Sequence, residues 1–171
     1  MSKLNITKVE LHKSGKKVVL TYQQLVVPEK GETFTKDVVA TIHRKPSEAL
    51  NNSFVKFTPH AMFISEIFPT LVENVDSYIN NFMFTDEPRF EKINVTAVEI
   101  SGKDLDFVQF TVSKTTSKLE TFTFKTPKIW LGDQEENAYA NSELLNTNVK
   151  EAFKEAESFY KPSTQAKLIL E

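Results

Sequence analysis

Apolar and polar residues alternate along the first quarter of the chain, and segments with helical periodicity follow. Alternation with a period of two is typical of strands that bury one face, and Gly or Pro turns separate the runs. The runs predict antiparallel strands at residues 5–13, 17–27 and 34–43. A helix is expected to begin at Ser47, a residue type that caps helix N-termini, because Leu50 and Phe54 then share one face. Further helical spacing continues to about residue 82.

The second half of the chain repeats this order. Alternating runs predict strands at residues 92–100, 107–113 and 120–130. A polar loop then leads to a helix that is expected to begin at Ser142, and Pro162 is expected to end it. Leu145 and Phe153 lie on the apolar face of this helix, and together with Leu50 and Phe54 of the first half they are predicted core residues.

Two matches suggest that the halves are copies of one unit. Residues 5–11 can be laid over residues 94–100 without a gap, and the pattern Ser-Glu-x-Leu-Asn opens both helices, at 47–51 and 142–146. The fold prediction is therefore α+β, with tandem duplicated βββα units, antiparallel strands and helices packed on one face of the sheet. The first half spans 1–84 with a helical extension, and the second spans 85–171 with a C-terminal tail. A single six-stranded α+β domain with an accidental resemblance between its halves is the alternative.

Composition limits the function more by what is missing than by what is present. The net charge is −2, so no basic field covers the whole molecule, and only Arg44 and Arg89 could supply a guanidinium. The chain has no cysteine, which excludes disulfides and thiolate metal sites. The first residues lack the apolar core of a signal peptide and no apolar run approaches the roughly 20 residues of a membrane span, so neither is expected. We therefore expect a cytoplasmic protein that does not enter a membrane.

Residue patterns that support catalysis are also missing. The three histidines, His12, His43 and His60, have no metal-ligand spacing, and each is expected at the surface or at a boundary. The four glycines lie far apart and form no phosphate-binding loop. The sequence thus predicts a protein that is not an enzyme and that has no metal site and no cofactor.

A basic and aromatic segment at residues 110–128 is the first candidate binding site. On a sheet, lysines can follow the phosphate backbone of single-stranded nucleic acid, and aromatic side chains can stack on its bases. The candidate lysines are Lys114, Lys118, Lys125 and Lys128. His43 and Arg44, at the end of the third strand, form the best polar pair for a binding surface. The favoured alternative is that Phe122 and Phe124 point into the core, because large apolar residues are usually inside.

The C-terminal tail is the second candidate. Gln165, Leu168 and Leu170 resemble the Gln-x-x-Leu-x-Phe peptides with which bacterial and phage replication proteins dock on the sliding clamp, with Leu170 in place of the terminal Phe. Such a peptide fills a preformed apolar groove on its partner. A final strand or a loose tail that packs on the core is the favoured alternative, because short motifs often match by chance.

The order of features resembles a loose set of small accessory proteins of bacteriophages and prophages from gut bacteria. The residues that carry the resemblance are 6–11, 17–22, 49–50, 56–60 and 126–127, with the late acidic helix and the tail. It implies a viral protein that acts inside a bacterial cell, and we expect it to bind nucleic acid or the replication machinery. The alternative is an anti-defence protein that binds a host immune protein or sequesters a nucleotide signal. The sequence leaves homo-oligomerisation open.

Overall fold

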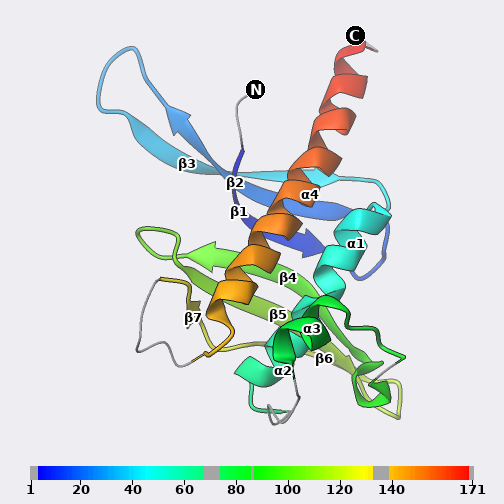
Figure 1. The fold of residues 1–171 in the computed structure, drawn as a ribbon. Helices are drawn as coiled ribbons and strands as arrows, with labels where there is room; N and C mark the ends of the chain where they lie inside the picture. Colours follow the sequence, from blue (N-terminus) through cyan, green and yellow to red (C-terminus); the bar gives the residue numbers. More distant parts are fainter. Residues whose placement is uncertain (1–3, 68–73, 86, 133–138, 170–171) are drawn as a thin grey trace.

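One antiparallel sheet organises the chain (Figure 1). The structure is a computed structural model, and it describes residues 4–67, 74–85, 87–132 and 139–169. The strands are β1 (Asn5–Leu11), β2 (Val18–Val26), β3 (Phe34–Ile42), β4 (Ile93–Ser101), β5 (Phe107–Thr115), β6 (Thr121–Lys125) and β7 (Ile129–Trp130). Their order is β3-β2-β1-β4-β5-β6, and β7 also pairs with β5. The α+β class and the antiparallel sheet are thus confirmed.

The third predicted strand of the second half is broken rather than continuous. Its first part is β6 and its second part is β7, and both pair with β5. Pro127 lies between them and has no N–H to offer a ladder. Thr126 compensates, because its N–H donates to the Phe110 carbonyl at 3.0 Å and its Oγ1 accepts from the Phe110 N–H at 3.1 Å.

The two three-stranded meanders join through β1 and β4. Only three residue pairs make this joint, Lys8↔Glu99, Val9↔Val98 and Glu10↔Ala97. The sheet therefore continues across the predicted boundary between residues 84 and 85. On either side of the joint β1 and β4 have no further paired residues, so the two meanders separate there.

Helices follow each meander. They are α1 (Glu48–Val55), α2 (Phe57–Ile64), α3 (Val75–Asn80) and α4 (Ser142–Ile169), with a short 3₁₀ turn η1 (Pro88–Phe90). Ser47 caps α1 as predicted, since its Oγ accepts from the Leu50 N–H at 3.2 Å. α4 crosses the face of the sheet, and α1 and α2 lie beside it (Figure 1).

The predicted end of the last helix was wrong. Pro162 does not stop α4, whose backbone continues to Ile169. Proline has no N–H and its ring crowds the preceding turn, which costs about 3 kcal/mol inside a helix. Residues 163–169 include Gln, Ala, Lys and Leu, which have good helix propensity, so the local sequence favours continuation of the helix past Pro162.

The core lies between the sheet and the helices. Leu50, Phe54 and Leu145 are buried there as predicted, but Phe153 is only half-buried. The buried stripe of α4 is Leu145, Val149, Ala152, Ala156 and Phe159. This stripe alternates steps of four and three residues, so Phe153 falls on its flank.

Candidate functional site

The β5–β6 hairpin presents an exposed aromatic ring next to a lysine. Lys114 on β5 is the direct cross-strand partner of Phe122 on β6, so both side chains leave the same face of the sheet. The Phe122 side chain is 48% exposed, whereas Phe124 is partly buried against the core, and the ring centroids are 6.3 Å apart. The favoured expectation that both rings point into the core was therefore wrong for Phe122.

A small cleft lies around this pair. It has a volume of about 320 Å³, and Lys92, Lys114 and Phe122 line it together with hydroxyl groups of the hairpin turn. The backbone fixes the cleft at its rim, because the Thr115 N–H donates to the Lys92 carbonyl at 3.0 Å and the Thr116 N–H to the Glu120 carbonyl at 2.8 Å. We call this place, defined by Lys92, Lys114 and Phe122, the hairpin cleft. Lys92 was not among the candidates from the sequence.

The four predicted lysines do not form one patch. Lys114 lines the hairpin cleft, and Lys118 lies in the turn between β5 and β6. Lys125 is opposite Thr111 and points to the other face of the hairpin, while Lys128 lies between β6 and β7. The segment is thus basic on both faces, and only Lys114 is combined with an exposed ring.

The two residues of the predicted polar pair at the end of β3, His43 and Arg44, have different surroundings. His43 is exposed. Arg44 is tied to α4, because its Nη2 donates to the Phe159 carbonyl at 2.7 Å and its Cζ lies 4.2 Å from the Phe159 ring centroid. A guanidinium held by a carbonyl and a ring stabilises the contact between this segment and α4.

A larger groove opens where the two meanders separate. It has a volume of about 990 Å³ and lies between the end of β1 and the first half of β4, with β5 and β6 beyond. Residues of α1, including Asn51 and Val55, also line it, so α1 forms its floor. Its strand residues belong mainly to the sheet face opposite the core. We call it the central groove. The sequence carries a signal for its wall in the alternating hydroxyls Thr111, Ser113 and Thr115.

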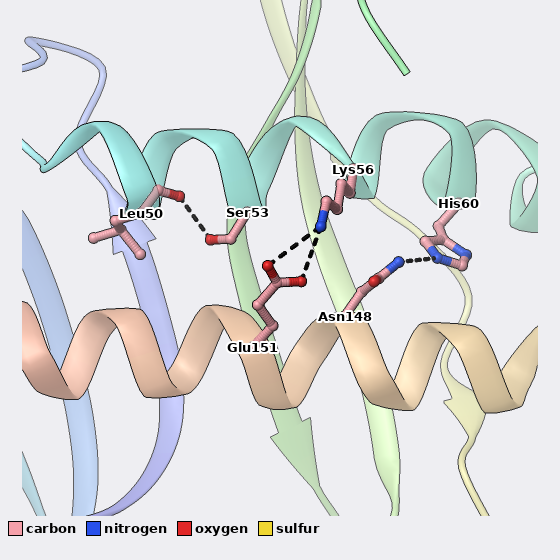
Figure 2. Close-up of polar contacts among 6 residues, drawn as sticks. All are labelled: Leu50, Ser53, Lys56, His60, Asn148 and Glu151. Atoms are coloured by element: carbon pink, nitrogen blue, oxygen red, sulfur yellow. Dashed lines mark hydrogen bonds and ion pairs between the residues drawn. The ribbon is translucent and has the colours of Figure 1, made fainter. Parts of the chain in front are cut away.

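A buried polar network joins α2 to α4. His60 is fully buried, which corrects its predicted place at a surface or boundary. Asn148 Nδ2 is 3.0 Å from His60 Nε2, and Tyr139 Oη is 2.6 Å from His60 Nδ1 (Figure 2 shows the His60–Asn148 contact). An amide NH₂ only donates, so Nε2 accepts and Nδ1 carries the proton.

Burial keeps this network neutral. It lowers the pKa of His60 to about 3, because a charged imidazole would lose its hydration. Burial also raises the pKa of the Tyr139 hydroxyl above its usual value. Beside the network, the Nζ of Lys56, which lies between α1 and α2, is 3.0 Å from the carboxylate of Glu151 on α4 (Figure 2). The network is enclosed by packing, so we assign it to stability rather than to ligand binding.

The predicted docking tail is only partly within the described chain. The backbone at Gln165 and Leu168 is helical as part of α4. Their side chains and the whole of Leu170 lie outside the described residues. Docking of this tail on a sliding clamp therefore stays a prediction.

Within the described ranges, no cluster of three or more His, Asp or Glu side chains could hold a metal ion. No helix in the part of the chain that the structure describes is long and apolar enough to cross a membrane. No protein-family model, curated protein or solved structure matches this chain significantly. The features that bear on function are therefore the hairpin cleft, the central groove and the exposed surfaces.

Proposed function

We propose that this chain is a non-enzymatic protein that binds single-stranded nucleic acid at the hairpin cleft, as an accessory protein of a bacteriophage inside its bacterial host. The observation that carries the proposal is the exposed Phe122 ring beside Lys114, with Lys92 in the same cleft. The resemblance to phage accessory proteins supports the biological setting.

The chemistry of the cleft suits a single strand better than a duplex. An unpaired base can stack on the Phe122 ring, and the ammonium groups of Lys92 and Lys114 can neutralise the neighbouring phosphates. A lysine contacts phosphate as a point charge and does not form the bidentate contacts that read a guanine edge. Binding should therefore tolerate many sequences.

The test is fluorescence anisotropy with a labelled single-stranded oligonucleotide. Phe122→Ala should weaken binding by about 1–3 kcal/mol, the usual loss for one stacked base. The matched control is Phe34→Ala, which removes an exposed ring from β3. Equal losses for both variants, or no binding at low salt by the unmodified protein, contradict the proposal.

Salt dependence tests the two lysines separately from the ring. Each phosphate contact on a single strand contributes about −0.7 to the slope of log K against log salt. The double variant Lys92→Gln/Lys114→Gln should make this slope shallower by about 1.4. Lys36→Gln, on β3, should leave it unchanged. An unchanged slope in the double variant removes the cleft from the phosphate path.

A specific observation favours a second candidate, binding of a host defence protein. The β2–β3 hairpin extends away from the helices and exposes Leu25, Phe34 and Val39 beside the open edge of β3 (Figure 1). Exposed apolar residues along an unpaired strand edge suit a protein partner. Leu25→Ser/Val39→Ser should abolish co-purification of such a partner from host cells and leave oligonucleotide binding intact. Retention of the partner by this variant excludes the β2–β3 hairpin as the interface, and the protein's mass in solution shows whether the edge pairs with a second copy instead.

We also infer that the sheet derives from a duplicated βββα unit. The central pair Val9↔Val98 joins two residues that the sequence overlay makes equivalent, which supports a pseudo-two-fold axis at that point. Both first strands have an irregular register at an equivalent threonine, Thr7 in β1 and Thr96 in β4. Each threonine Oγ1 donates to the neighbouring strand at 3.3 Å, to the carbonyls of Thr21 and Thr111 respectively.

A further inference from the structure

The central groove owes its existence to the short joint between β1 and β4. Pairing ends at Glu10↔Ala97, so the next residues of β1 separate from the first half of β4 and the groove opens between them. Val55 of α1 and Phe84 contribute apolar surface to it. Strands and helix α1 thus surround the groove, and a ligand would need no large rearrangement of the backbone to enter.

The charges that line the groove are mainly positive, although the whole chain carries −2. Lys8 and Lys13 come from β1 and the turn that follows it, and Lys125 comes from β6 on the other side. Glu10 is the carboxylate among the lining residues, and its Oε2 lies 3.5 Å from the Lys8 Nζ. Lys13 and Lys125 are exposed, and they remain to attract an anion from two sides.

Short neutral polar groups cover much of the remaining wall. Ser113 and Thr123 are cross-strand partners on β5 and β6, and Asn94 of β4 is the partner of Ser113 on the other side. These three side chains form a row across three strands, and Asn51 of α1 lines the same groove. Hydroxyl and amide groups both donate and accept, which matches the hydroxyls of a sugar.

We propose that the central groove binds a small, phosphate-bearing and hydroxyl-rich molecule, either a nucleotide or a sugar phosphate. Lys13 and Lys125 neutralise the phosphate, and the row of Asn94, Ser113 and Thr123 receives the sugar hydroxyls. The apolar surface of Val55 and Phe84 is available to a base. The site is distinct from the hairpin cleft, which is defined by Lys92, Lys114 and Phe122.

Isothermal titration calorimetry with three probes tests the site and separates the two sources of ligand. The probes are adenosine 5′-monophosphate, ribose 5-phosphate and inorganic phosphate, each titrated at millimolar concentration at low salt. We expect both organic phosphates to bind more tightly than inorganic phosphate. Tighter binding of the nucleotide assigns the groove to nucleotides, and equal binding of the two assigns it to sugar phosphates. No binding of any probe, or equal binding of all three, overturns the proposal.

Variants show whether the binding takes place in the groove. Lys13→Gln/Lys125→Gln should weaken the affinity for the organic phosphates at least tenfold, while the control Lys36→Gln/Lys103→Gln, with equal loss of charge, should not. Thr123→Val, which keeps the side-chain shape, should weaken binding of ribose 5-phosphate but not of inorganic phosphate. Lys114→Gln should leave these affinities unchanged, so failure at the hairpin cleft and failure at the groove are distinguishable. Unchanged affinity in both the Lys13/Lys125 double variant and Thr123→Val refutes the assignment.

Discussion

The two outer hairpins of the sheet, β2–β3 and β5–β6, both bury apolar residues on the face toward the core, but their residues on the opposite face differ in chemistry. Leu20 of β2 pairs with Val9 and Phe110 of β5 pairs with Val98, so the two occupy corresponding positions, and both are fully buried. On the opposite face, β2–β3 exposes Leu25 and Val39, whereas β5–β6 carries a row of hydroxyls and Lys125. Packing against one core constrains the inward positions, and no such constraint applies outside.

This difference shows where binding chemistry can be located in such a sheet. An apolar arm suits a protein partner, and a basic, hydroxyl-rich hairpin suits phosphate-bearing ligands. Both surfaces are built on the same antiparallel framework, so the backbone alone does not decide the function.

The largest effect on the free energy of unfolding is expected from truncating a side chain on the buried face of a hairpin. Phe110→Ala should destabilise the protein by about 3–5 kcal/mol, because it removes a fully buried ring that lies 5.0 Å from the Phe57 ring, centroid to centroid. Leu20→Ala should cost about 2–5 kcal/mol for the same reason. Urea denaturation monitored by circular dichroism measures both values.

The exposed control for this experiment is Phe122→Ala, on the same face of the hairpin as Phe110, which should change the free energy of unfolding by no more than about 0.5 kcal/mol. If Phe122→Ala is as destabilising as Phe110→Ala, the Phe122 ring is buried in the folded protein and its assignment as an exposed ring is wrong.

Most of the sheet could be predicted from the sequence, because its strands have the period-two alternation that a half-buried sheet requires. The buried His60 was missed, although it lies in the run Phe57–Ile64, in which every residue is buried. A helix with apolar residues on all sides indicates a core helix, and the consecutive residues Ala61, Met62, Phe63 and Ile64 gave that signal in the sequence. The central groove could not be predicted, because it depends on the number of residue pairs between β1 and β4, two strands far apart in sequence.

The buried polar network between α2 and α4 should give the stability of the protein a specific dependence on pH. The folded pKa of His60 is about 3 and its ordinary value is 6.5, so between these values the unfolded chain binds an extra proton. The contribution of neutral His60 is complete above about pH 6.5 and is lost as pH falls toward about 3. The free energy of unfolding should decrease in this window by up to about 1.4 kcal/mol per pH unit.

His60→Gln separates this effect from the carboxylates, which are the same in both proteins. The variant should be less stable at neutral pH but should show a shallower pH dependence between about pH 3 and 6.5. Parallel stability curves for the two proteins would mean that His60 is not held neutral in the folded state.

The smallest expected effect tests the equivalence of the two halves. Thr7 and Thr96 each donate from Oγ1 to a carbonyl of the adjacent strand at the point where the register is irregular. Thr→Val keeps the shape of the side chain and removes the hydrogen bond, which contributes about 0.5–1.5 kcal/mol. If the halves are copies of one unit, Thr7→Val and Thr96→Val should cost about the same, near 1 kcal/mol each.

Thr41→Val, at an exposed position on β3, is the control and should be near neutral. A clear cost at one threonine and none at the other means that the two irregularities have different physical roles. The similarity of the halves would then extend only to their strand order.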